Sequence, residues 1–119
     1  MKLEASLKSQ ASFYNENIKW KRFERAAKYV PRKDRPAFLK MQEADRELLD
    51  VTDVDVMDVS LDEGDITKGK VLVWYTYYKL PDNRLKKTLF EQSWNYDGEK
   101  DWWYVDYEST RPASSEKLE

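Results

Sequence analysis

The sequence predicts an α+β protein in which N-terminal helices pack on one face of a curved, four-stranded antiparallel meander sheet. Apolar residues recur at spacings of three and four up to about residue 48, which is typical of amphipathic helices. Beyond that point they recur at every second position, which is typical of strands with one buried face. Three clusters of turn-forming residues, at 62–65, 81–84 and 97–100, divide this second half into consecutive strands.

The composition indicates one folded domain without cysteine or histidine chemistry. The 119 residues are 40% hydrophobic and 37% charged, which supplies enough apolar material for a core. The net charge of −2 favours no class of partner. The lack of cysteine and histidine weighs against disulfides, metal centres and triad-type catalysis. We therefore expect no cofactor and no metal site.

Two helices are expected before Pro31, because the apolar stripe changes sides along this segment. The stripes within residues 3–15 and 18–30 lie on opposite sides of one helical wheel. One straight helix cannot bury both stripes against one core. The polar residues 15–17 lie where the stripes change, so we place the break there, with one long, bent helix as the alternative.

A third helix is expected after Pro31. Asp34 is suited to cap its N-terminus, and Pro36 is tolerated in its first turn. Its core-facing residues follow the helical spacing: Phe38, Met41, Ala44 and Leu48.

Four strands follow, at about residues 48–61, 69–80, 84–96 and 101–108. The first strand alternates apolar and acidic residues, and this alternation slips at Val56 and Met57, which indicates a β-bulge. The single domain is expected to span residues 1–110. Residues 111–119 form a polar, flexible tail, and Leu118 and Glu119 could be the remnant of a tag.

Hairpin parity assigns the strand residues to two faces whether each turn contains two or four residues. The more apolar face, which should meet the helices, carries twelve residues: Val71, Val73, Tyr75, Tyr77, Thr88, Phe90, Gln92, Trp94, Tyr96, Trp103, Val105 and Tyr107. Four of these are candidates to line a ligand cavity, with ordinary core packing as the alternative: Tyr75, Tyr77, Trp94 and Trp103.

The opposite face of the sheet is mixed but contains large apolar side chains. Five of them are candidates for an interface: Trp74, Tyr78, Leu89, Trp102 and Tyr104. A contiguous aromatic patch on a protein surface usually marks an interaction site. We therefore expect this face to contact a second copy of the chain in a dimer, with coverage by the tail or the first helix as the alternative.

The charged residues are strongly segregated along the chain. Residues 19–35 contain eight basic and two acidic side chains, whereas residues 43–65 contain ten acidic and one basic. Pairing between these two segments is the better interpretation, so nucleic-acid binding is not expected. The acidic segment lacks the glycine and glutamate that a calcium-binding EF-hand loop needs.

The predicted strands do not bring two carboxylates together at a position where they would form a catalytic pair. Glu91 and Asp106 fall on the outer face as neighbours, and Asp101 falls at the start of the last strand. No catalytic residue is predicted on this basis.

Two stretches, "WKRFERAAKYVPRKDRPAFL" (20–39) and "WNYDGEKDWWYV" (94–105), resemble patterns in a known superfamily. Together with the order of helices and strands, they are similar to small bacterial members of the nuclear transport factor two-like (cystatin-like) superfamily. The resemblance implies a conical roll with a cavity between helices and sheet, and frequent dimers. Enzymes of that superfamily use Asp, His or Tyr in the cavity, and this chain has no His.

The expected function is therefore a non-enzymatic binding module with a cavity for a small apolar ligand or a protein partner. The alternative is a cavity-based isomerase or hydrolase-like enzyme that uses an Asp/Tyr pair, which a buried carboxylate beside a tyrosine would favour. The resemblance also implies a location in the cell envelope as a processed lipoprotein, with the cytoplasm as the alternative. The sequence itself contains no transmembrane segment and no apolar signal core at residues 1–10; Met1 could replace an export segment, and a lipid anchor could precede it.

Overall fold

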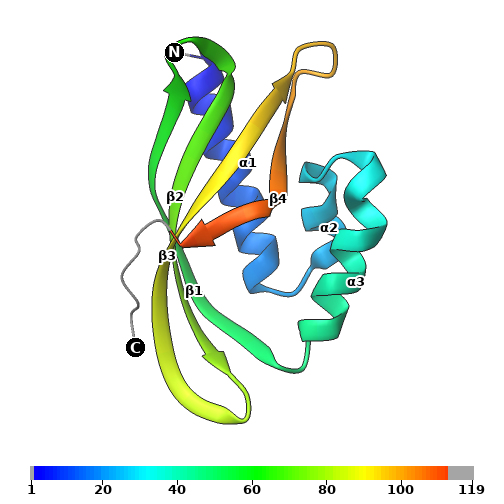
Figure 1. Ribbon diagram of the computed structural model, residues 1–119, viewed down its shortest axis with the longest axis vertical. Coiled ribbons are helices and arrows are strands. Elements are labelled where there is room, and N and C mark those ends of the chain that lie inside the picture. Colours follow the sequence, from blue (N-terminus) through cyan, green and yellow to red (C-terminus); the bar gives the residue numbers. More distant parts are fainter. Residues whose placement is uncertain (1, 113–119) are drawn as a thin grey trace.

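The computed structural model describes residues 2–112, apart from the side chains of residues 83 and 109–112. Three helices, with two short 3₁₀ turns, precede four strands and lie on one face of the sheet (Figure 1). The helical elements are α1 (Lys2–Lys19), α2 (Phe23–Ala26), η1 (Ala27–Tyr29), η2 (Arg32–Asp34) and α3 (Arg35–Asp45). The strands are β1 (Leu49–Asp62), β2 (Asp65–Lys79), β3 (Asp82–Asp97) and β4 (Trp102–Pro112).

The strands form one antiparallel sheet in the order β1-β2-β3-β4, which is not closed into a barrel. This arrangement confirms the predicted fold class. The predicted bulge is also confirmed, since the pairing of β1 with β2 shifts between Val56 and Asp58. The pairing of the two strands shifts a second time between Val51 and Asp53. The alternation of apolar and acidic residues in the sequence did not indicate this shift.

The predicted break at residues 15–17 is wrong. Helix α1 continues to Lys19, and the chain turns at residues 20–22, where Lys21 adopts a positive φ of 59°. Asn15 misled the prediction, because it is polar yet fully buried within α1. The second apolar stripe is nevertheless buried at Phe23 and Ala26, in a helix much shorter than expected.

Helix α3 begins after Asp34 with Pro36 in its first turn, as predicted, but the Asp34 side chain makes no capping hydrogen bond. Of its four expected core residues only Phe38 is buried. Met41 is 43% exposed and Leu48 51% exposed, because a pocket separates this end of α3 from the sheet.

Strand β4 runs to Pro112, four residues beyond the predicted end. Phe90 of β3 pairs with Pro112, and Glu91 pairs with Arg111, so residues 111 and 112, which were predicted to lie in the tail, belong to the sheet. The rest of the predicted tail, residues 113–119, lies outside the described residues.

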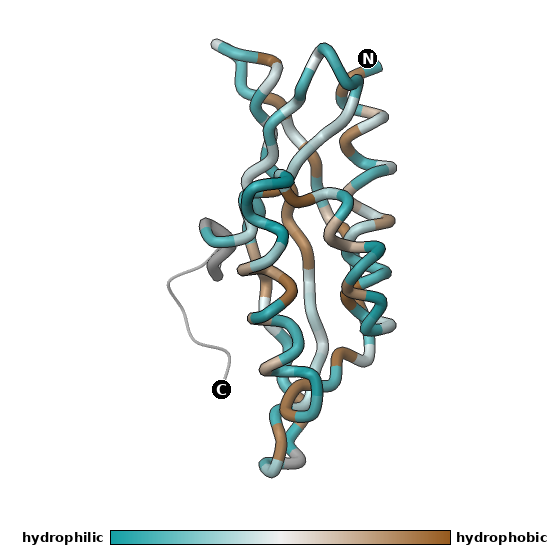
Figure 2. Tube along the Cα trace, turned by 90° about the vertical axis from the view of Figure 1, so that its right-hand side faces the viewer, coloured by the Kyte–Doolittle hydropathy of each residue, from teal (hydrophilic) through white to brown (hydrophobic). Residues whose placement is uncertain are grey.

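The predicted assignment of the inner face is confirmed by the pairing of the strands. Val73 lies opposite Phe90, and Trp94 lies opposite Val105. The most deeply buried residues of the sheet all belong to this face: Val71, Val73, Gln92, Trp94, Trp103 and Val105. Figure 2 shows hydrophobic positions alternating with hydrophilic ones along the helices, as expected for helices with one buried side.

Gly69 allows α1 to approach β2 closely. A Cβ atom at this position would lie 2.5 Å from Cδ2 of Leu7 and 3.3 Å from the backbone oxygen of Ser60. A larger residue would therefore require the Leu7 side chain to move.

Candidate ligand pocket

A pocket of about 350 Å³ lies between the helices and the inner face of the sheet, near the end of the sheet where α3 leads into β1. Both helical and strand residues line it: Tyr14, Ile18, Met41, Gln42, Asp45, Leu49, Val51, Tyr75, Tyr77, Lys79, Phe90, Gln92 and Tyr107. Its size and mainly apolar wall are typical of small-molecule sites.

Tyr14 gives the pocket a free hydrogen-bonding group. The residue is only 5% exposed, and its hydroxyl has no hydrogen-bond partner among the described residues. No fully enclosed polar side-chain atom in the described part lacks a partner, so this hydroxyl must open into the pocket that Tyr14 lines. A ligand with a polar atom can bond to it at little desolvation cost.

Burial raises the pKa of three tyrosines that line this pocket: Tyr14, Tyr75 and Tyr107. The pKa of Tyr14 rises above the ordinary tyrosine value because of burial, and the nearby Tyr107 adds to the shift. The pKa of Tyr75 rises well above that value, again because of burial first and of Tyr14 second. These hydroxyls are therefore neutral at physiological pH. The Tyr14 hydroxyl can donate its proton to a ligand, whereas the proton of Tyr75 is already donated to Asn15.

A buried network of hydrogen bonds forms the inner wall. The Tyr75 hydroxyl donates to Oδ1 of Asn15 (2.5 Å), and Nε2 of Gln92 donates to the same oxygen (2.8 Å). Nδ2 of Asn15 donates to the carbonyl of Ala11 (2.8 Å) and to Oε1 of Gln92 (3.2 Å). Oε1 of Gln92 also accepts a bond from the Trp94 indole (3.2 Å). The network joins α1 to β2 and β3, and it fixes Tyr75 at the pocket.

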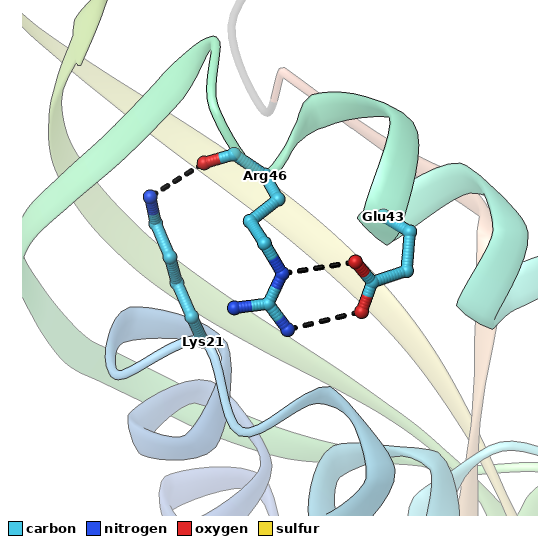
Figure 3. A network of polar contacts seen from close by, with 3 residues as sticks. All are labelled: Lys21, Glu43 and Arg46. Atoms are coloured by element: carbon cyan, nitrogen blue, oxygen red, sulfur yellow. Dashed lines mark hydrogen bonds and ion pairs between the residues drawn. The ribbon is translucent and has the colours of Figure 1, made fainter.

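Lys21 holds together the segments beside the pocket mouth. Its ammonium group donates to the carbonyl of Arg46 (2.5 Å), just after α3, and pairs with Asp50 of β1 at 2.8 Å. Arg46 in turn makes two hydrogen bonds to Glu43 (Figure 3). These contacts anchor the loop after α1 to the connection between α3 and β1, which carries the lining residues Asp45 and Leu49.

Two of the four predicted cavity residues line this pocket, and two do not. Tyr75 and Tyr77 contribute to its wall, and the Tyr77 hydroxyl lies 3.1 Å from Oγ1 of Thr88. Trp94 and Trp103 are instead packed in the core, at 1% and 0% exposure. The Trp103 indole donates to Oγ of Ser6 (2.9 Å), so it ties α1 to β4 and leaves no surface for a ligand.

Sequence reasoning missed Tyr14 and Gln92 as pocket residues. Tyr14 was recognised only as part of a helical apolar stripe. Gln92 did carry a signal, because it is the one amide on an otherwise aromatic and aliphatic run of the inner face, where a polar group needs partners.

The carboxylates do not come together at the pocket. Asp45 is the one acidic side chain among the described lining residues, and it is exposed. The hydrogen bond between an aspartate and a tyrosine lies elsewhere, on the surface of the β3–β4 turn, where the Tyr96 hydroxyl donates to Asp101. The Asp/Tyr pair required by the enzymatic alternative is thus not formed by the described part of the pocket.

Part of the basic segment pairs with the acidic strand, as the charge pattern indicated. Lys19 lies 4.0 Å from Asp53, and Lys21 lies 2.8 Å from Asp50. Within residues 2–112, no three acidic side chains cluster as they would to hold a metal ion.

The five predicted interface residues do not form one patch. Trp74 lies directly opposite Leu89, and Tyr78 lies on the same face two positions further along the alternation. Tyr104 is opposite Asn95, six residues along β3 from Leu89, a distance of roughly 20 Å in a strand.

The assignment of Trp102 to the face away from the helices is wrong. Its ring stacks on Tyr29 with a centroid distance of 5.1 Å, and its indole donates to the carbonyl of Lys28 (2.9 Å). It lies at the first position of β4, opposite Asp97, beside the turn, where strand parity no longer controls the direction of a side chain.

No helix in the described part of the chain has the length and apolarity of a membrane span. No protein-family model matches the chain, and no curated protein or solved structure matches it either. Membership of the nuclear transport factor two-like superfamily therefore stays a prediction from the sequence.

Proposed function

We propose that the protein is a binding module that takes up a small, largely apolar molecule in the pocket between the helices and the sheet. The observation that carries the proposal is the Tyr14 hydroxyl, which has no partner among the described residues and opens into a pocket whose wall is mainly apolar, with side chains such as Ile18, Val51 and Phe90. Protein cores rarely keep such a group without a partner. A ligand with one hydrogen-bonding group and an apolar body satisfies both features.

The pocket favours binding over catalysis. Its inner end presents neutral tyrosine hydroxyls, and the one acidic lining residue described, Asp45, is solvent-exposed. An acid–base reaction would need a group whose pKa is shifted toward neutrality, whereas the pKa values of Tyr14, Tyr75 and Tyr107 move further from it.

Filling the pocket should abolish binding of an apolar probe. We expect the neutral fluorophore N-phenylnaphthylamine to bind the parent protein with increased emission, and Val51→Phe to weaken binding on the order of tenfold, since its ring occupies the pocket. Val59→Phe is the matched control, because Val59 is also half-buried on β1 but does not line the pocket. Absence of probe binding, or equal binding to both variants, would contradict the proposal.

We propose self-association through the outer sheet face as a second function. Trp74 opposite Leu89 and Tyr78 opposite Leu85 form a stripe of two apolar pairs, which are separated by Thr76 opposite Lys87, and Leu85 is 57% exposed. Paired aromatic and aliphatic side chains of this kind are typical interface anchors.

A charge placed in this stripe should dissociate the expected dimer. In light scattering at tens of micromolar protein, we expect a dimer for the parent and a monomer for Trp74→Glu. Tyr104→Glu is the matched control and should stay dimeric, because Tyr104 lies on the same face but away from the stripe. A monomeric parent would count against self-association.

A further inference from the structure

Part of β3 has a neighbouring strand on one side only. β2 pairs with β3 over residues 82–95, whereas β4 pairs with it only over residues 90–97. Within residues 2–112, the backbone N–H and C=O groups of residues 83–89 that point away from β2 therefore have no strand to bond to. Figure 1 shows this region as the β2–β3 hairpin, which reaches beyond the helices at the bottom of the view.

The other edge of the sheet is protected, and this one is not. β1 carries three irregularities in its pairing and a row of exposed acidic side chains: Asp50, Asp53, Asp55 and Asp58. Bulges and charges of this kind prevent a strand from pairing with another chain. The pairing of β3 with β2 is unbroken from Leu85 to Asn95, so the free edge of β3 is a regular strand that a further strand can join.

The side chains along this edge define what can join it. Arg84 and Lys86 lie on one side of the strand by alternation, and Leu85, Lys87 and Leu89 lie on the other. No acidic residue occurs between Asp82 and Glu91. The edge is therefore basic on both sides, and one side is also partly apolar.

We propose that residues 83–89 bind an extended segment of a partner protein in which acidic and apolar residues alternate. Backbone hydrogen bonds add the segment as a fifth strand, its acidic side chains meet Arg84 and Lys86, and its apolar side chains extend the surface of Leu85 and Leu89. The same edge of a second copy is disfavoured, because two basic strands would face each other. This site is independent of the ligand pocket, since it uses the outer edge of the hairpin.

The experiment compares two labelled peptides on the full chain by fluorescence anisotropy. One peptide alternates glutamate and valine over eight residues, and the other alternates lysine and valine. We expect the acidic peptide to bind at least about tenfold more tightly. Arg84→Glu together with Lys86→Glu should reverse this preference. Arg25→Glu together with Lys28→Glu, the same charge change at exposed sites on the helical side, should leave it unchanged.

Hydrogen exchange locates the bound peptide. On binding, alternate amides within residues 83–89 should gain protection, because only those N–H groups point to the free edge. Equal affinity for the two peptides, no effect of the charge-reversed pair, or protection outside this segment would each overturn the proposal. Binding that occurs only after residues 113–119 are deleted would also overturn it, because it would assign the edge to the chain's own C-terminus.

Discussion

Replacement of Asn15 by alanine should lower the free energy of unfolding by about 3–5 kcal/mol, because it leaves buried groups without partners. Asn15 is fully buried and bonds to Tyr75, Gln92 and the carbonyl of Ala11. After substitution, the Gln92 amide and the Tyr75 hydroxyl each lose a partner, and each loss costs about 1–3 kcal/mol. The gain in helix propensity from alanine, about half a kcal/mol, offsets little of this. Urea denaturation of both proteins measures the difference.

Asn17→Ala is the matched control for this prediction. Asn17 makes the same type of bond, from Nδ2 to the carbonyl four residues earlier (2.8 Å), but at an exposed site on α1. Its replacement should change the free energy of unfolding by less than about 0.5 kcal/mol. Similar losses for the two variants would mean that the buried network does not stabilise the fold.

Stability should fall steeply above pH 10, because Tyr14 and Tyr75 resist ionisation in the folded state. Their pKa values are raised by burial, whereas in the unfolded chain they return to about 10. At pH values between about 10 and the folded pKa values, the folded protein therefore binds more protons than the unfolded protein. The stabilising contribution is complete below pH 10 and is lost as pH rises toward the folded pKa values. Each tyrosine lowers the free energy of unfolding by about 1.4 kcal/mol per pH unit while the pH lies between its unfolded and its folded pKa.

Phenylalanine variants isolate this effect from the titration of lysines, which is common to all the proteins compared. Tyr14→Phe removes one ionisable group and keeps the ring, and should reduce the alkaline slope by about 1.4 kcal/mol per pH unit. Denaturant midpoints measured from pH 8 to pH 12 give the slopes. A variant as sensitive to alkali as the parent would show that the Tyr14 hydroxyl already has ready access to bulk solvent.

The two faces of the sheet could be predicted because their assignment needs only the parity of the turns. Val73 and Phe90, or Trp94 and Val105, fall on one face for any even number of turn residues. Trp102 does not follow the parity rule, because the residue before it, Asp101, has a φ of 53° in the turn. The Trp102 ring therefore points toward the helices and stacks on Tyr29.

The helix break and the pocket could not be predicted from local patterns. A polar residue in a helix normally faces water, and burial of Asn15 becomes favourable through its bonds to Tyr75 and Gln92, 60 and 77 positions away. The pocket likewise depends on how far α3 stands from the sheet, which leaves Met41 at its wall and not in the core. The location in the cell envelope and the lipid anchor derive from the family resemblance and stay predictions.

The contacts of Trp103 with α1 determine when the chain can complete its fold during synthesis. The Trp103 backbone N–H donates to Oε1 of Gln10, and its indole donates to Ser6, across separations of 93 and 97 residues. Helix α1 packs chiefly against β1, but Ser6 and Gln10 acquire these two partners only after the last strand has been made. Such long-range contacts slow folding, and a nascent chain that stops before β4 lacks them.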